Sequence, residues 1–253
     1  MALSTYNNNK VLLIVPPQRQ VESNRFTKRE LGQEGKFPPL GLGYIAAVLR
    51  QNHIEVKIID ALALNLTNRQ VCDIIIKEAS LFVGITVLTQ QYTAAITLAK
   101  AIKDIAPQIK IILGGPHVHF EHEEVIRQEC VDFCVRGEGE YTMLELVNAA
   151  KNNIDPMLVR GITFRDKEGN VVVTPGRGFI ENLDEIPFPA RELLPVSSYN
   201  ATISLGGGRP FTAILATRGC PFDCHFCSLH SMWKGQRRRS VKNVLDEIEH
   251  LKS

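Results

Sequence analysis

The sequence has no hydrophobic stretch that approaches the roughly 20 apolar residues needed to span a bilayer. The amino-terminal segment, residues 1–10, is polar and lacks the apolar core of a secretory signal. Basic side chains exceed acidic ones by little, 29 against 27, so the formal charge of +2 gives no electrostatic reason to expect nucleic acid as a partner. These absences favour a cytoplasmic globular protein without a membrane span.

Cysteine is scarce, but three of the six cysteines lie close together. Cys220, Cys224 and Cys227 have Cys-x-x-x-Cys-x-x-Cys spacing and follow an apolar run, residues 211–216, that is predicted to be a strand. A 4Fe–4S cluster is usually held by four cysteines. Three local thiolates would therefore leave one iron open to a substrate or cofactor, which makes this loop a candidate reaction centre.

Two other uses of these cysteines are less consistent with the sequence. Structural zinc usually draws on two separated Cys or His pairs, and no second pair follows Cys227, although His225 or His230 could supply a fourth ligand. A disulfide is poorly served by three crowded cysteines without a secretory segment. The remaining cysteines are expected to be small buried hydrophobic residues: Cys72, Cys130 and Cys134.

Residues 10 to about 150 alternate between apolar runs of strand length and segments with helical spacing. Strands are predicted at residues 10–15, 55–59, 81–86, 109–113 and 131–135. Helices are predicted at residues 42–51, 68–79 and 91–105, near 121–129, and at 140–151. Continuous apolar strands are typical of parallel strands covered on both faces. This α/β pattern predicts a doubly wound parallel sheet, whose ligands bind at the carboxyl ends of the strands.

The expected strand ends carry proline, glycine and polar residues. Glycine allows the backbone to approach a ligand closely, and the helix start after Gly139 offers unpaired amides. Taken singly, each of these segments is also an ordinary turn. The candidate ligand contacts are Pro17, Thr86, Leu88, Thr89, Gly114, Gly115, Pro116, His117, Arg136, Gly137, Glu138, Gly139 and Glu140.

The cysteine loop resembles the cluster loop of the radical S-adenosylmethionine enzymes. Its spacing, its Thr-Arg-Gly-Cys lead-in and Phe226 before the third cysteine carry the resemblance. The resemblance implies that Cys220, Cys224 and Cys227 hold a 4Fe–4S cluster and that S-adenosylmethionine chelates the open iron, with Phe226 beside the cofactor. It also implies that the reduced cluster cleaves the sulfonium to give a 5′-deoxyadenosyl radical.

Residues 37–47, 113–117 and 135–140 resemble the cobalamin-binding domain that precedes the radical barrel in cobalamin-dependent radical S-adenosylmethionine enzymes. The resemblance covers nearly the whole chain, including residues 182–189. It implies a flavodoxin-like fold and strand-end loops that cradle the corrin ring and its nucleotide tail. The family includes anaerobic C-methyltransferases and ring-forming enzymes such as the anaerobic magnesium-protoporphyrin ester cyclase. The implied partners are a small-molecule substrate and an electron donor of the flavodoxin or ferredoxin type.

One departure concerns the lower face of the corrin. Cobalamin domains of the mutase type place a histidine after the first strand, in Asp-x-His-x-x-Gly, but no histidine precedes His53 here. Cobalamin is therefore expected to bind without a histidine from that loop. His117 is the nearest candidate for contact with the cofactor, or is a polar loop residue that bonds backbone. The long loop at residues 16–39 could cover the corrin or contact substrate.

The predicted organisation is a cobalamin-binding domain at residues 1–151, a linker with a hairpin at 152–205, and the first βα unit of a radical barrel at 206–253. The hairpin is expected from strands at 161–165 and 170–174. Residues 234–239 are expected to be a solvated loop, or to meet the anionic parts of a cofactor or substrate. Ser240 is expected to cap a final amphipathic helix. Because a radical barrel has several βα units, the chain is expected to be an amino-terminal fragment of a longer enzyme.

Three functions remain open at this point. The first is a cobalamin-dependent radical enzyme that methylates carbon, rearranges it or closes a ring. The second is a non-catalytic cobalamin-binding or sensing module, which would not need the cysteine loop. The third is a methylthiotransferase-like enzyme, which would need three cysteines at strand ends for a second cluster, and Cys72 falls inside a predicted helix instead.

Overall fold

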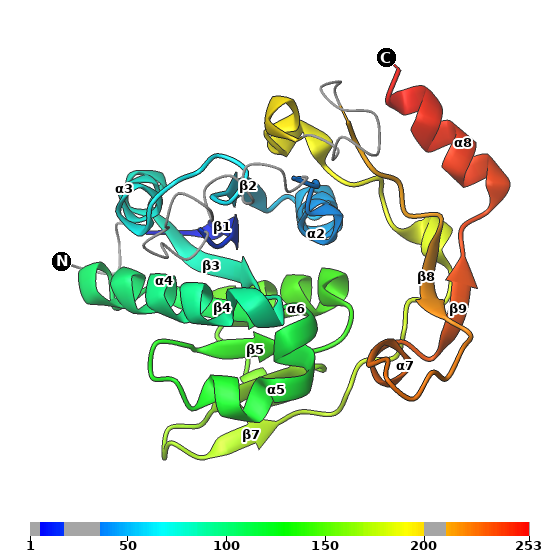
Figure 1. Cartoon of the computed structure of the whole chain (residues 1–253). Helices are drawn as coiled ribbons and strands as arrows, with labels where there is room; N and C mark the ends of the chain where they lie inside the picture. Colours follow the sequence, from blue (N-terminus) through cyan, green and yellow to red (C-terminus); the bar gives the residue numbers. More distant parts are fainter. Residues whose placement is uncertain (1–5, 18–35, 200–210, 253) are drawn as a thin grey trace, which may run out of the picture.

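The computed structural model describes residues 6–17, 36–199 and 211–252. A seven-stranded sheet forms its main body (Figure 1), with the strand order β2-β1-β3-β4-β5-β6-β7. The first five strands along the chain are parallel, which confirms the predicted doubly wound architecture. Their bounds are β1 Asn7–Val15, β2 Glu55–Asp60, β3 Ser80–Thr86, β4 Lys110–Gly114 and β5 Phe133–Val135.

Helices cover both faces of the sheet, so the strands are buried on both sides. Alternate residues of β1 enter two separate cores: Leu12 and Ile14 pack with one set of helices, and Leu13 with the other. The first set is α3 (Asn68–Glu78), α4 (Tyr92–Ile105) and α5 (Pro116–Ile126). The second set is α2 (Leu40–Gln51) and α6 (Gly139–Lys151).

The helix after β4 begins earlier than predicted. The sequence predicts it near residues 121–129, but α5 starts at Pro116, directly after Gly115, which has a φ of 100°. Proline is favoured in the first turn of a helix because its fixed φ suits that position and its missing N–H would have no partner there. Pro116 and His117 therefore belong to the first turn of α5 and not to a loop.

The hairpin predicted in the linker is part of the sheet. Strands β6 (Ile162–Arg165) and β7 (Val171–Val173) pair antiparallel and extend the sheet beyond β5. Arg136 ties them to β5, because its guanidinium donates to the carbonyl oxygens of Ile162 (3.3 Å) and Thr174. The sheet thus continues past residue 151 and ends at β7.

The connector after β7 returns across the sheet through short 3-10 turns. Their bounds are Leu183–Glu185, Arg191–Leu193 and Val196–Ser198. A separate 3-10 turn, Pro156–Leu158, lies between α6 and β6. The amide of Ala190 donates to the carbonyl of Gly43 in α2 (3.0 Å), and the Tyr199 hydroxyl donates to the Asp60 carboxylate (2.9 Å). The connector is therefore fastened to the ends of α2 and β2.

The segment that carries the cysteines differs most from its prediction. The strand predicted at residues 211–216 is wrong: strand β8 is Thr217–Cys220, and Cys220 lies in it. Residues 234–239 are not a loop, because β9 (Gly235–Arg238) pairs with β8 antiparallel. The run at 211–216 pairs with no strand among the described residues, although the carbonyl of Ala216, next to β8, accepts from the amide of Arg239 (3.0 Å), just beyond β9.

Two helices complete this segment, α7 (Leu229–Met232) and α8 (Val241–His250), drawn in orange and red in Figure 1. The amide of Asn243 donates to the Ser240 hydroxyl (3.1 Å), which confirms the predicted cap of the last helix. No helix within the described ranges has the length and apolar character to cross a membrane. Most of the loop at residues 16–39 lies outside the described residues.

Candidate functional site

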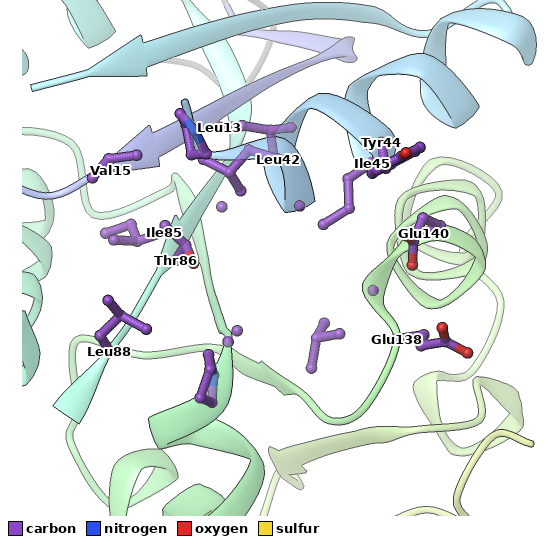
Figure 2. Close-up of a pocket in the computed structure, with 18 of the residues that line it drawn as sticks. Leu13, Val15, Leu42, Tyr44, Ile45, Ile85, Thr86, Leu88, Glu138 and Glu140 are labelled. Carbon is purple, nitrogen blue, oxygen red and sulfur yellow. The ribbon is translucent and has the colours of Figure 1, made fainter. Parts of the chain in front are cut away.

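A cavity of about 760 Å³ opens at the carboxyl ends of the parallel strands. In Figure 2 the side chains of Leu13, Ile45 and Thr86 surround this opening. The cavity lies where the strand order reverses, since the chain continues from β1 to β2 on one side and returns to β3 on the other. Loops diverge at such a point and leave a crevice, which is the usual ligand site of doubly wound sheets.

Two separate parts of the chain form the walls of this cavity. One wall is the sheet with its strand-end loops and α2, and it is mostly aliphatic, with Leu13, Val15, Leu42 and Ile85 among its side chains. The opposite wall comes from the cysteine-bearing segment and consists of Leu215, Thr217, Arg218, Gly219, Leu229, Met232 and Trp233. Gly219, which directly precedes Cys220, therefore lies on the cavity. A bound molecule would contact both parts of the chain.

Two glycines shape the cavity for different reasons. Gly115 has a φ of 100°, and a Cβ there would lie 2.9 Å from the carbonyl oxygen of Val87, so the loop after β4 requires glycine. Gly41 in α2 has no such constraint, because an added Cβ would meet no atom within 4 Å. The missing side chain at Gly41 keeps room open for a ligand.

Many of the residues predicted from the strand ends line the cavity together. They are Thr86, Leu88, Gly114, Gly115, Pro116, Gly137, Glu138, Gly139 and Glu140. The other predicted contacts do not line it: Pro17, Thr89, His117, Arg136 and Phe226. Thr89 begins a 3-10 turn before α4, and Phe226 is 93% exposed.

His117, the predicted candidate for contact with the cofactor, does not lie on the cavity. The ring of His117 packs against that of Tyr92, with 4.5 Å between centroids, and does not line the cavity. Burial lowers the pKa of His117. None of the described residues that line the cavity is a histidine.

Glu138 and Glu140 line the cavity, but their carboxylates are already paired. Glu138 contacts Arg218 (2.9 Å) and Arg237 (2.8 Å), and Glu140 contacts Arg218 (2.6 Å). Burial alone would lower the pKa of Arg218, but Glu140 and Glu138 raise it. Arg218 is therefore a permanent cation at the edge of the cavity.

Sequence reasoning missed a polar corner beside β2. Asp60, at the end of β2, accepts hydrogen bonds from the amide of Ala63 (2.8 Å) and the hydroxyl of Tyr199 (2.9 Å). Burial raises the pKa of Asp60. Lys36 donates to the carbonyl of Ala63 (2.9 Å). A carboxylate directly after the apolar pair Ile58 and Ile59, at the end of β2, was the available signal for this corner.

Tyr44 of α2 is a second residue that sequence reasoning did not single out. Its side chain is buried and lines the cavity, and its hydroxyl has no hydrogen-bond partner among the described residues. The Arg218 guanidinium lies over the ring, 4.9 Å from its centroid. Tyr44 thus brings an unpaired hydroxyl and a cation–π contact to the same edge.

The three cysteines of the loop are free thiols. Cys220 and Cys227 are half-buried and Cys224 is exposed, and the amide of Cys227 donates to the carbonyl of Cys224 (2.9 Å). Across the described parts of the chain, no three His, Cys, Asp or Glu side chains lie close enough together to hold a metal ion. The structure thus shows the donors on one segment without assembling them.

Comparisons with known proteins agree on the family. The B12-binding domain family matches residues 33–147. An uncharacterized methyltransferase of Pyrococcus horikoshii is 41% identical over 245 residues, which cover 96% of this chain and 50% of that protein. The anaerobic magnesium-protoporphyrin IX monomethyl ester cyclase of Rubrivivax gelatinosus is 34% identical over 222 residues, covering 86% of this chain and 39% of the cyclase.

Solved structures show the same fold. The cobalamin-dependent S-adenosylmethionine radical enzyme OxsB, with aqua-cobalamin and S-adenosylmethionine bound, matches with a TM-score of 0.74 at 20% identity, over 95% of this chain and 31% of OxsB. The radical S-adenosylmethionine methyltransferase TsrM from Kitasatospora setae matches with a TM-score of 0.69 at 17% identity, over 96% of this chain and 45% of TsrM. Residues 33–147 thus match the B12-binding domain family, and nearly the whole chain is similar to methyltransferases and a cyclase and shares the fold of cobalamin-dependent radical S-adenosylmethionine enzymes.

The residues present can be compared with what this similarity implies. The chain spans about half the length of the curated relatives it matches, or less. The cavity fits a large, mostly apolar ligand, since it has an aliphatic floor, glycines at its rim and an unpaired buried hydroxyl. The cysteine loop fits a cluster in the type and number of its donors.

The buried cysteines outside the loop behave as predicted. Cys72, Cys130 and Cys134 are all buried in the core that includes α3, α4 and α5. Burial raises the pKa of Cys134 to about 12, so this thiol is a poor metal ligand. Their positions give no support to a second cluster of the methylthiotransferase kind.

Proposed function

We propose that this chain binds cobalamin in the cavity and supplies the cluster loop of a radical S-adenosylmethionine enzyme that methylates carbon or closes a ring. One observation carries this proposal: the cavity at the strand ends is walled on its other side by the segment that bears the three cysteines. A ligand between these walls would lie beside the cluster loop. The relatives whose printed names are methyltransferases and cyclases support the same chemistry.

The chain's own residues have distinct tasks in this proposal. Leu13, Val15 and Ile85 exclude water from the floor of the cavity, and the backbone at Gly114 and Gly115 approaches the ligand. No described lining residue is a histidine, so the protein would hold the corrin through its faces and edges and not through cobalt. When bound, the cofactors would supply radical and methyl-transfer chemistry.

We also propose that Cys220, Cys224 and Cys227 hold a 4Fe–4S cluster. Three thiols leave one iron open, as S-adenosylmethionine binding requires. The three thiols must draw closer together for this, because they do not form a metal-holding group in the described parts of the chain. The half-exposed loop permits such an adjustment without disturbing the sheet.

The test is anaerobic reconstitution with iron and sulfide, followed by metal and corrinoid analysis. We expect about four irons for each chain, and bound corrinoid after incubation with hydroxocobalamin. Alanine at Cys220, Cys224 or Cys227 should abolish the iron, while the matched control Cys72→Ala, which removes a thiol far from the loop, should retain it. Stoichiometric zinc without iron uptake would overturn the cluster assignment.

A second candidate is a cobalamin carrier or sensing module without a cluster. The observation that favours it is that the three thiols are not gathered around one point in the structure. The same experiment separates the two candidates. Corrinoid bound without iron would support the carrier or sensing module, and corrinoid bound together with iron would support the radical enzyme.

A small-molecule substrate and an electron donor of the flavodoxin or ferredoxin type complete the proposal. A cluster of this kind is reduced by one electron at low potential, and such donors act in the cytoplasm, where we propose that the protein works. Reduction of the reconstituted chain by a reduced flavodoxin, followed by paramagnetic resonance, tests this. Failure of flavodoxin and ferredoxin where dithionite succeeds would exclude that donor class.

A further inference from the structure

Four charged side chains form one buried group at the edge of the cavity. Glu138 and Glu140 come from the β5–α6 junction, Arg218 from β8 and Arg237 from β9. Their side chains are 2%, 5%, 11% and 10% exposed, respectively. We call this group the carboxylate–arginine cluster. Its formal charge is zero, with two carboxylates against two guanidinium groups.

The cluster joins two parts of the chain that are far apart in sequence. Arg218 and Glu138 are 80 positions apart, and Arg237 and Glu138 are 99 apart. Glu138 and Glu140 belong to the sheet part, at the same side of the opening in Figure 2. Arg218 precedes Cys220 by two residues in the same strand. The cluster is thus a direct link between the cavity rim and the start of the cysteine loop.

The pairing of β8 with β9 gives this link a physical requirement. Arg218 lies directly opposite Arg237 in the antiparallel ladder. Opposite residues project on the same face, and like charges there destabilise the pair. The two carboxylates offset this repulsion only when the β8–β9 ribbon lies against the β5–α6 junction. The ribbon therefore gains stability from docking at that place.

Aromatic and backbone contacts fix the guanidinium groups further. Arg218 lies over the ring of Tyr44, and Arg237 lies 4.9 Å from the ring centroid of Phe179. Arg237 also donates to the carbonyl of Ile180 (2.7 Å), whose amide donates to Glu138 (2.6 Å). A planar guanidinium held by stacking and by two partners has a defined orientation, which a lysine could not reproduce.

A nearby ion pair shows that not every charge pair of this region has such a role. Glu145 lies on the same helix, α6, and pairs with Arg177, but its side chain is 47% exposed. Exposed pairs contribute little to stability, because water solvates each charge nearly as well as the partner does. A buried group that loses one partner instead leaves an uncompensated charge out of water.

We propose that the carboxylate–arginine cluster is a positioning device that holds the β8–β9 ribbon, and with it Cys220, against the mouth of the cavity. Glu138, Glu140, Arg218 and Arg237 are positioning residues in this sense. The second wall of the cavity then exists only while the cluster is intact. The part of this inference that concerns a corrinoid rests on the proposed function, whereas docking of the ribbon does not.

The first test is hydrogen–deuterium exchange on the whole chain without cofactors. Glu140→Gln and Arg218→Gln should speed exchange of the amides in β8 and β9 by more than about tenfold. Glu140→Gln leaves two buried guanidinium groups to share the Glu138 carboxylate, and Arg218→Gln leaves Glu140 without its arginine. Exchange in β3 should stay unchanged. Glu145→Gln is the matched control on the same helix and should alter neither region. Unchanged β8–β9 exchange, or an equal increase throughout the sheet, would overturn the proposal.

The second test measures binding of hydroxocobalamin by absorption titration. Glu140→Gln and Arg218→Gln should raise the Kd by more than about tenfold, Arg218→Lys should lie between them and the parent chain, and Glu145→Gln should bind like the parent. Equal Kd values for the parent chain and Arg218→Gln would contradict the positioning role. A parent chain that binds no corrinoid would refute the proposed function instead, and the exchange experiment alone would then decide whether the cluster docks the ribbon.

Discussion

The sheet and the cysteine-bearing segment are held in place by different forces. The sheet is packed with fully buried aliphatic and aromatic side chains such as Leu12, Ile14 and Phe82. Within the described residues 211–252, Met232 is the single buried apolar side chain, and Phe222, Phe226 and Val241 are 68%, 93% and 77% exposed. Charged contacts attach this segment to the rest of the chain.

The last helix shows the same principle at a second place. Glu247 of α8 is fully buried and pairs with Arg191 of the connector (2.5 Å) and with Arg239. Arg191 also donates to the carbonyl of Ala213 (2.7 Å). Hydrophobic burial is non-directional and tolerates small shifts, whereas these ion pairs specify particular partners. The comparison suggests that the sheet provides stability and the arginine contacts provide position.

Removal of one phenylalanine from each region tests whether the sheet and the cysteine-bearing segment are held by different forces. Phe82→Ala should lower the free energy of unfolding by about 3–5 kcal/mol, because it leaves a cavity in the sheet core. Phe222→Ala, at a 68% exposed position, should change it by less than about 0.5 kcal/mol. Urea unfolding followed by circular dichroism measures both. Comparable losses from the two variants would mean that the cysteine-bearing segment has a core of its own.

A neighbouring pair of acidic residues on α8 tests the charged contacts. Glu247→Gln should destabilise the docking of α8 by about 3 kcal/mol, because two buried arginines lose their shared carboxylate. Asp246→Asn removes an adjacent charge whose side chain is 45% exposed, and its effect should stay below about 1 kcal/mol. Exchange rates of the α8 amides provide the readout. Unaltered protection in Glu247→Gln would show that apolar packing holds α8.

Two glycines that line the cavity are needed for different reasons: Gly115 for its backbone conformation and Gly41 for the room it leaves to a ligand. Gly115→Ala should destabilise the fold by about 1–3 kcal/mol, since its φ of 100° is unfavourable for alanine and the Cβ would meet Val87. Gly41→Ala should leave stability unchanged or slightly raised, because α2 favours alanine and the space is open. Thermal unfolding measures both changes. A stable Gly115→Ala protein would mean that the loop after β4 can relax.

The smallest expected effect is a pH dependence at the edge of the sheet. Hydrogen bonds from Lys10 and Lys57 lower the pKa of Glu78 from its ordinary value of 4.5 to about 2. Its contribution to stability is therefore fully present above pH 4.5 and is lost as the pH falls toward about 2. Glu78→Gln should unfold with a weaker dependence on pH in that window. Identical acid unfolding curves for both proteins would contradict the assignment.

The sheet, which is held by apolar packing, could be predicted from the sequence better than the cysteine-bearing segment, which is held by charged contacts. The parallel strands and the helices that cover them were predicted because continuous apolar runs indicate strands buried on both faces and helical spacing indicates helices with one buried face. The strand predicted at residues 211–216 was wrong because an apolar run forms a strand only beside a partner, and none lies there among the described residues. The pattern carried no information about such a partner.

The strand-end half of the candidate site was predicted from the sequence, but the charged contacts to the cysteine-bearing segment were not. Strand-end glycines such as Gly114 and Gly137 were found because topology places them on the crevice. The partners of Glu138 and Glu140 were not found, because Arg218 and Arg237 are remote in sequence and were expected in a loop lead-in and a solvated loop. Pairing between distant charges depends on tertiary structure, which the local sequence does not encode.

Paramagnetic resonance of the chain incubated with cob(II)alamin shows whether the cavity holds cobalamin without a protein ligand to cobalt. We expect bound corrinoid whose cobalt shows no nitrogen hyperfine splitting, because no described lining residue is a histidine and the cofactor's own base is expected to be displaced. Absence of binding would contradict it. So would a nitrogen splitting that disappears in His117→Ala, since that histidine would then be the lower ligand.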